Sequence, residues 1–185
     1  MVFSSILFLF RFMPAAFAIY YLVPKRFKNF TLLVLSLIFY SWGEAKYFPV
    51  MIASIVVDYT ASGLIESHRN NKLICRLGLI YSVVFNLGML GFFKYTNFFV
   101  GNLNALFGLS LPTISFVLPL GISFYTFQTM SYTIDVYLGK VKAERNIIDF
   151  GAFVVLFPQL IAGPIVRYTD INRELKERQI NLPQI

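Results

Sequence analysis

The stretch FVLPLGISFYTFQTMSYTIDVYL, from Phe116 to Leu138, is long enough to cross a lipid bilayer as a helix, yet it is not uniformly apolar. Polar or small side chains recur along it at helical spacing, so they share one face of the predicted helix. This set, called the polar seam below, consists of Gly121, Tyr125, Gln128, Ser131, Tyr132 and Asp135. Because unpaired polar groups are costly in hydrocarbon, the seam is predicted to face other helices or a water-filled cavity. It either lines a tunnel or forms hydrogen bonds that hold helices together.

The composition of the chain is that of an integral membrane protein. It is 57% hydrophobic and 14% charged, with a mean hydropathy of +0.68, whereas soluble domains are about 45–50% apolar and 25% charged. The formal charge of +7 comes from short basic clusters between apolar runs, without a nucleic-acid-binding motif. Nucleic acid is therefore excluded as a partner, and the lipid bilayer is expected instead. The single cysteine, Cys75, excludes an internal disulfide and a multi-cysteine metal site.

Five apolar runs predict an all-α protein with about five transmembrane helices. The first run carries Arg11 and Pro14, which predict a kink or an interfacial turn. The second run is only marginally long enough to span and must use Gly43. The runs cover residues 3–23, 30–42, 47–65, 77–100 and 116–138.

The loops between these runs alternate in charge, and this alternation predicts the topology. Basic turns occupy residues 24–28, 66–76 and 139–148, whereas the loops at 43–46 and 101–115 are nearly neutral. Since basic loops stay in the cytoplasm, the chain is predicted to be a multi-pass protein of the cytoplasmic (inner) membrane with its N-terminus outside.

The last apolar run, from Asp149 to Val166, is interrupted. Pro158 follows about nine helical residues, or about 14 Å of rise, and Gly163 and Pro164 break the chain again. This pattern predicts a broken or re-entrant element sheltered by protein, and the alternative is an ordinary sixth crossing. A re-entrant element returns the chain to the side on which it began, so residues 167–185 are expected to form a polar cytoplasmic tail.

Two titratable residues stand out, but neither completes a catalytic site. Asp58 lies deep in the third run, so it is either a functional residue or a structural partner for a lysine, arginine or tyrosine. His68, the one histidine, lies in a charged turn and is expected to be an ordinary loop residue. No nucleophile elbow, phosphate-binding glycine loop or histidine pair is present. We therefore assign no catalytic residue and no metal ligand to this chain.

Four segments carry a resemblance to a known family. The pair LPLGISFYTFQTMSYTIDVYLG (118–139) and FPQLIAGPIVRY (157–168), with the earlier MVFSSILFLFRFMP and LLVLSLIFYSWGEAKYF, resembles the membrane-bound O-acyltransferases that acylate extracellular polysaccharides. The resemblance implies that residues 1–185 form one transmembrane region, the N-terminal portion of a larger helical bundle with a tunnel. The tunnel-lining candidates are Tyr125, Gln128, Ser131, Tyr132, Asp135 and Gln159, and the backbone break is at Pro158, Gly163 and Pro164.

The resemblance also implies a function. Such an enzyme transfers an acyl group, here expected to be acetyl, from a cytoplasmic donor such as acyl-CoA or an acyl carrier protein to hydroxyls of an extracellular polysaccharide. Polymer export and modification proteins are the implied partners, and no bound cofactor is expected. The family's catalytic histidine lies in a later helix, placed by the resemblance beyond Ile185, so this part is expected to be inactive alone. Alternatives are a small transporter or channel subunit and a non-catalytic membrane partner.

Overall fold

A computed structural model describes residues 8–108, 110, 112, 119, 121–156 and 168, without the side chains of Leu9 and Glu44. Within these residues every regular element is a helix and there is no strand, as the sequence predicted. The elements are η1 (Phe8–Phe12), α1 (Met13–Leu22), η2 (Lys25–Phe27), α2 (Lys28–Glu44), α3 (Phe48–Ser67), α4 (Lys72–Phe107), α5 (Ile122–Tyr137) and α6 (Ile147–Val155).

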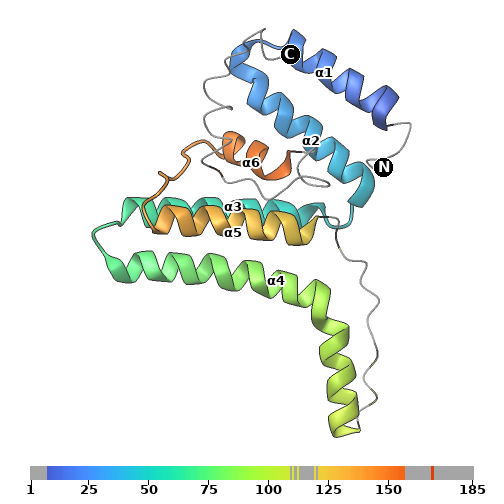
Figure 1. Cartoon of the computed structure of the whole chain (residues 1–185), viewed down its shortest axis with the longest axis vertical. Helices are drawn as coiled ribbons and strands as arrows, with labels where there is room; N and C mark the ends of the chain where they lie inside the picture. The colour runs from blue at the N-terminus through green and yellow to red at the C-terminus, as the bar shows by residue number, and fades with distance from the viewer. Residues whose placement is uncertain are drawn as a thin grey trace.

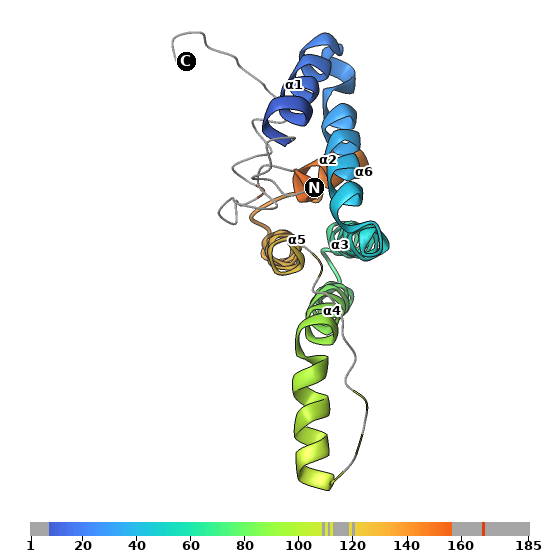
Figure 2. The same cartoon turned by 90° about the vertical axis from the view of Figure 1, so that its right-hand side faces the viewer.

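Helices α3 and α5 and the first part of α4 form the centre of the molecule. They run side by side, and Figure 2 looks along their axes and shows them at the corners of a triangle. The short helix α6 packs on α2, α3 and α5, and α1 packs along α2 (Figure 1). Helices α2 and α6 thus cover the side of the α3–α5 pair that faces away from α4.

Helices α3 and α4 are joined by a tight turn. His68 is the C-cap of α3, and Asn71 is the N-cap of α4, where its side-chain oxygen accepts from the backbone N–H groups of Leu73 and Ile74 at 3.1 and 3.4 Å. Such a cap satisfies donors that the first helical turn leaves free. Gly78 is buried where α4 packs on α3, and a Cβ atom there would lie 3.1 Å from Cγ1 of Ile65.

Helix α4 is longer than the sequence predicted. It has 36 residues, or about 54 Å of rise, and continues through residues 101–107, which we expected to be part of a neutral loop. It ends where Gly108 takes the left-handed conformation with φ 61°. The buried side chains of α4 recur up to Leu90, and beyond them the helix bends away from α3 and α5 (Figure 1).

Helix α5 is shorter than the sequence predicted. The expected helix ran from residue 116 to 138, but the observed one begins at Ile122 and has 16 residues. Gly121 precedes it with φ 72°, a conformation that side chains disfavour, and this turn sets the start of the helix. At about 24 Å, α5 falls short of a hydrocarbon core of about 30 Å.

The remaining helices agree with the predicted interruptions. A π-helical turn containing Arg11 precedes α1, and Pro14 lies in the first turn of α1. Helix α2 includes Gly43, as its marginal length required. Helix α6 has nine residues and ends at Val155, in agreement with the short helical part predicted before Pro158. The break itself, at Pro158, Gly163 and Pro164, lies outside the described residues, as does Gln159.

Two helices are individually long and apolar enough to cross a membrane, namely α3 and α4. This finding is consistent with a membrane helix bundle, but it does not confirm the predicted count of about five crossings. The apolar surface agrees with a lipid environment, since large hydrophobic side chains are exposed on several helices. On α4 alone they include Leu73, Leu77, Ile80, Tyr81, Val84, Leu87, Phe92, Phe98 and Phe99.

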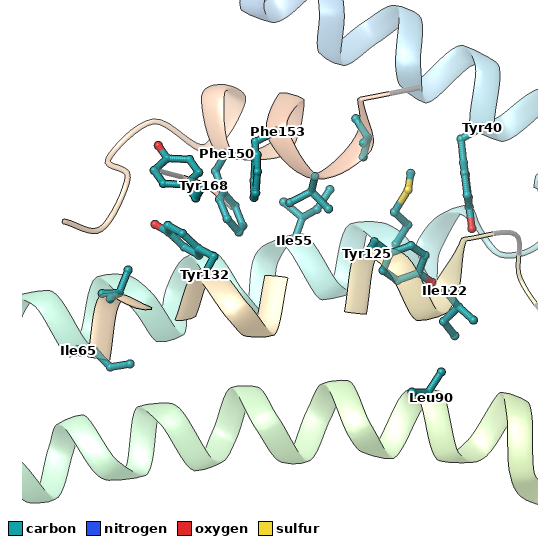
Figure 3. Packing of buried hydrophobic residues seen from close by; sticks show 14 of the residues in the cluster. Tyr40, Ile55, Ile65, Leu90, Ile122, Tyr125, Tyr132, Phe150, Phe153 and Tyr168 are labelled. Atoms are coloured by element: carbon teal, nitrogen blue, oxygen red, sulfur yellow. The ribbon is translucent and has the colours of Figure 1, made fainter. Parts of the chain in front are cut away.

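The main hydrophobic core lies between α3, α5 and α6. Tyr132 of α5 packs against Phe150 and Tyr168 with ring centroids 4.7 and 4.8 Å apart, and Phe153 packs on Tyr168 at 5.0 Å (Figure 3). A second, smaller cluster joins Phe8 and Phe39, which connects η1 to α2. Through these aromatic contacts α6 is fixed against the polar seam of α5.

The three basic turns lie at one end of the bundle. The Asn29 amide, just after the first turn, donates to Asp149 at 2.7 Å. Arg69 of the second turn donates to the Val136 carbonyl at 3.1 Å, just before the third turn. We call residues 24–29, 66–76 and 136–149 the basic end. Their grouping is what the alternating loop charges require if all three turns share one side of a membrane.

Candidate functional site

The most unusual site among the described residues is a buried carboxylate that is held by neutral side chains. Asp58 of α3 is 0% exposed. It accepts a very short hydrogen bond from Ser82 Oγ, one from Asn86 Nδ2 at 2.8 Å and one from Thr133 Oγ1 at 3.0 Å. Since Ser82 and Asn86 belong to α4 and Thr133 to α5, this single carboxylate connects all three central helices.

The sequence left two alternatives for Asp58, and the structural one named the wrong kind of partner. A buried acid was expected to be functional or to pair with a lysine, arginine or tyrosine, but all three observed partners are neutral. The difference has a physical reason. Serine, threonine and asparagine side chains can donate hydrogen bonds from one membrane helix to another without bringing a second charge into hydrocarbon. The pattern of charged residues in the sequence could not predict that neutral side chains would hydrogen-bond to Asp58.

The Asp58 network is the middle of a longer polar core. Further buried polar side chains follow helical spacing on both sides of it, one turn apart along α3 and along α5. Among the described residues we define the polar core as Ser54, Asp58 and Ser62 on α3, Ser82 and Asn86 on α4, and Thr126, Thr129 and Thr133 on α5.

Part of the polar core is unsatisfied within the described part of the chain. Ser54 Oγ, Thr126 Oγ1 and Asn86 Oδ1 are buried and have no hydrogen-bond partner there. Buried polar groups are normally paired, with protein or with water. These three atoms are therefore the exceptions in a polar core whose other members are mostly hydrogen-bonded.

The predicted polar seam lies on the neighbouring face of α5 and turns toward α6. Gln128 Nε2 donates to the Phe153 carbonyl at 3.1 Å, which is the kind of helix-joining contact that the packing alternative predicted. Tyr125 and Tyr132 are fully buried, Asp135 is buried near the end of α5, and Ser131 is partly exposed. The structure therefore brings most of the seam together as an internal face, and whether it lines a tunnel remains a prediction.

Tyr132 of the seam belongs to a second cluster at the basic end. Its hydroxyl accepts from the Glu144 backbone N–H at 2.7 Å, and the Tyr168 hydroxyl donates to Glu144 Oε2 at 2.5 Å. Burial raises the pKa of Tyr168, and the bond to Glu144 raises it further. Tyr168 thus stays a neutral donor, and Glu144 connects α5 to the residues that follow α6.

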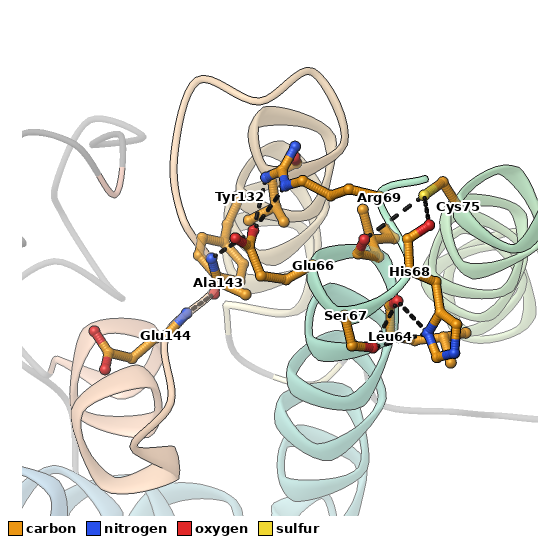
Figure 4. A network of polar contacts seen from close by, with 11 residues as sticks. Leu64, Glu66, Ser67, His68, Arg69, Cys75, Tyr132, Ala143 and Glu144 are labelled. Carbon is orange, nitrogen blue, oxygen red and sulfur yellow. Dashed lines mark hydrogen bonds and ion pairs between the residues drawn. The ribbon is translucent and has the colours of Figure 1, made fainter. Parts of the chain in front are cut away.

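An ion pair organises the turns of the basic end. Arg69 donates to Glu66 Oε2 from Nη2 at 2.7 Å and from Nε at 3.2 Å, and the same carboxylate accepts from the Ala143 backbone N–H at 3.4 Å (Figure 4). A cavity of about 470 Å³ opens beside it, lined by Tyr59, Thr60, Gly63, Glu66, Ser67, Ala143, Glu144 and Arg145. These contacts hold the turn between α3 and α4 against the turn that follows α5.

His68 lies at this end but outside the clusters. Its side chain is exposed, with Nδ1 at 2.8 Å from Ser67 Oγ and 3.2 Å from the Leu64 carbonyl. This is the position expected of a loop residue. Within the described residues, no group of three or more histidine, cysteine, aspartate or glutamate side chains could hold a metal ion.

Comparison with known proteins gives three informative relatives. The chain is 42% identical over 182 residues to the probable alginate O-acetylase AlgI of Azotobacter vinelandii, covering 96% of this chain and 36% of the relative. The corresponding protein of Pseudomonas aeruginosa is 41% identical, with coverages of 96% and 35%. The peptidoglycan O-acetyltransferase of Helicobacter pylori is 33% identical over 207 residues, with coverages of 96% and 39%.

The other comparisons add nothing to this result. No protein-family model matches the chain, and no solved structure matches it. The chain spans about a third of the length of the curated relatives it matches. The resemblance read from the sequence is confirmed by these relatives: along nearly its whole length, the chain is a homologue of part of the alginate O-acetylases and of a peptidoglycan O-acetyltransferase.

Proposed function

We propose that this chain is the N-terminal part of a membrane O-acyltransferase that transfers an acetyl group to hydroxyls of an extracellular polysaccharide. The observation that carries the proposal is the 42% identity to an alginate O-acetylase across 96% of the chain. Both kinds of relative are named for O-acetylation of a carbohydrate polymer. The relatives give no support to the transporter alternative.

In this proposal the chain contributes structure and surfaces, while the catalytic base comes from the rest of the enzyme. The α3–α4–α5 centre and α6 form part of the wall around the tunnel, with Gln128, Ser131 and Asp135 of the polar seam turned inward. The basic end is the donor side, since acyl-CoA and acyl carrier proteins are anionic and would be attracted by its charge. The acceptor polymer and its export proteins approach from the opposite side.

A chimera tests the proposed function. Replacing the matched segment of the Pseudomonas aeruginosa alginate O-acetylase by this chain should restore acetylation of alginate in cells that lack the enzyme. The readout is the acetyl content of purified alginate. The chain expressed alone should insert into the membrane and give no acetylation, because a positioned base is needed for attack by a sugar hydroxyl.

The controls of this experiment separate assembly from chemistry. The relative with its matched segment deleted should be inactive, and membrane fractions should contain the chimera in amounts similar to the intact relative. A chimera that accumulates in the membrane but leaves alginate unacetylated would contradict the proposal, as would acetylation by the chain alone.

The proposed orientation is tested by cysteine labelling in intact cells. With Cys75→Ser as background, Ala45→Cys reports the neutral loop and Asn70→Cys the basic end; both positions are exposed. An impermeant maleimide applied from outside should label Ala45→Cys and not Asn70→Cys, because basic turns remain in the cytoplasm. Asn70 is used because neighbouring Asn71 caps α4. The opposite labelling pattern would place the N-terminus inside.

A further inference from the structure

We propose that the start of α4 holds a binding site for the phosphate headgroup of an anionic phospholipid. Two adjoining cavities of about 560 and 300 Å³ open there and share Lys72 and Tyr137 in their linings. Together they are lined by Ile65, Arg69, Lys72, Leu73, Cys75, Arg76, Tyr137 and Leu138. This pocket, called the α4 pocket below, lies between the start of α4 and the ends of α3 and α5, and it shares no lining residue with the cavity beside Glu144.

The charge of the α4 pocket selects an anion. Arg69, Lys72 and Arg76 supply three cations, and no acidic side chain is among the described residues that line it. Lys72 and Arg76 are exposed and lie one helical turn apart, so they share a face of α4. Neither makes an ion pair within the described part of the chain. Their charges are therefore available to a ligand.

Arg69 is positioned for the same ligand by its own contacts. Nη2 and Nε are held by Glu66 and by the Val136 carbonyl, while Nη1 lies against Gly139, where a Cβ atom would come within 3.3 Å. The guanidinium is thus fixed across the turn after α5 instead of moving freely in solvent. A fixed cation loses less entropy on binding an anion than a mobile one.

The apolar surface that continues from the pocket points to a lipid as the source of the phosphate. Along α4 the exposed side chains Leu73, Leu77 and Val84 are 66, 55 and 64% exposed, with Ile80 and Tyr81 between them. This strip begins at the pocket and follows an α-helix that is long and apolar enough to cross a membrane. Acyl chains lying along the strip would bring a glycerophosphate to Lys72 and Arg76.

The aromatic residue in the lining agrees with a position at the level of the lipid headgroups. Tyr137 closes the end of α5 and borders both cavities, and tyrosine is enriched at the level of lipid headgroups. Basic pockets between membrane helices bind anionic headgroups on the cytoplasmic side, which is where the three basic turns would lie. The proposal requires a membrane location but does not depend on acyl transfer.

Native mass spectrometry of the purified chain in detergent tests the site. Phosphatidylglycerol should bind in preference to phosphatidylcholine, and Lys72→Gln with Arg76→Gln should weaken phosphatidylglycerol binding about 30-fold, because each interfacial cation contributes about 1 kcal/mol. Lys25→Gln with Arg26→Gln is the matched control, since it removes the same charge from exposed positions in another turn of the basic end. It should leave most of the preference intact.

The other arms identify the source of the phosphate. Glycerol 3-phosphate, which has the headgroup phosphate without acyl chains, and coenzyme A should fail to displace the bound lipid. Displacement by either would overturn the lipid assignment in favour of a soluble phosphate compound. Equal losses of phosphatidylglycerol binding in the two double variants would show that the overall charge of the chain is responsible. Unchanged phosphatidylglycerol binding in the Lys72→Gln, Arg76→Gln variant would refute the proposed site. Circular dichroism of each variant checks that its helices are retained.

Discussion

Replacing Asp58 by leucine is expected to lower the stability of the helix bundle by about 3 kcal/mol. The substitution removes the acceptor of Ser82, Asn86 and Thr133, which are all fully buried. Each buried donor left without its acceptor costs about 1–3 kcal/mol. The substitution also removes the cost of burying the carboxylate, but this gain offsets only part of the summed cost of the three donors. The measurement is the thermal or denaturant midpoint of the purified chain in detergent micelles.

A compensated variant separates the hydrogen-bond network from simple loss of volume. Adding Ser82→Ala, Asn86→Leu and Thr133→Val to Asp58→Leu removes the stranded donors and should recover much of the lost stability, since replacing all partners by apolar groups is far less costly than removing one. Asp58→Asn alone should fall between the wild type and Asp58→Leu. If the quadruple variant is no more stable than Asp58→Leu, the network does not hold the helices together.

Replacing Gly78 by leucine is expected to destabilise the contact between α3 and α4 by about 3 kcal/mol. A Cβ atom at this position would lie 3.1 Å from Ile65 Cγ1 and 3.5 Å from the Ala61 carbonyl oxygen and from Leu64 Cδ2. The full leucine side chain would force the two helices apart, and overpacking typically costs about 1–3 kcal/mol. Since Ser82 lies one turn further along α4, the same displacement would lengthen its bond to Asp58.

The same helix offers a matched control for the Gly78 prediction. A Cβ atom at Gly88 or Gly91 would meet no described atom within 4 Å. Gly88→Leu should be neutral or slightly stabilising, because leucine exceeds glycine in helix propensity by about 0.7 kcal/mol. Melting of the variants in parallel checks both values. Equal losses at Gly78 and Gly88 would indicate that glycine is needed for helix flexibility and not for close approach.

The elements that could be predicted are those bounded by charge. Helix α3 was located within two residues at each end because GEAK precedes it and a charged turn follows it. Helix α4 was ended too early because GNLNALF, at 101–107, is uncharged and resembles a neutral loop, although it contains no proline and continues the helix to Gly108. Hydropathy marks where a chain enters or leaves lipid, but helices continue until a capping residue stops them.

The candidate site was predicted only in part, for a related reason. Asp58 was recognised because a carboxylate is conspicuous in an apolar run, whereas Ser82, Asn86 and Thr133 are common in membrane helices and carry no such signal. Their hydrogen bonds to Asp58 depend on how α3, α4 and α5 are shifted along their axes relative to one another, which is a property of the tertiary structure. The spacing of Thr126, Thr129 and Thr133 could have indicated a second polar face of α5, but the aromatic and charged residues of the polar seam dominated the sequence pattern.

The shared carboxylate also has a consequence for biogenesis. As the chain leaves the ribosome, α3 enters the translocon before any of its partners exist, and an aspartate at mid-helix raises the free energy of insertion by about 2.5–3.5 kcal/mol. The tight turn between His68 and Asn71 delivers Ser82 and Asn86 directly afterwards, so α3 and α4 are suited to enter lipid as a hairpin in which Asp58 is already solvated. Thr133 is synthesised only after α4, so we expect its bond to Asp58 to join α5 to a pair of helices that has already formed.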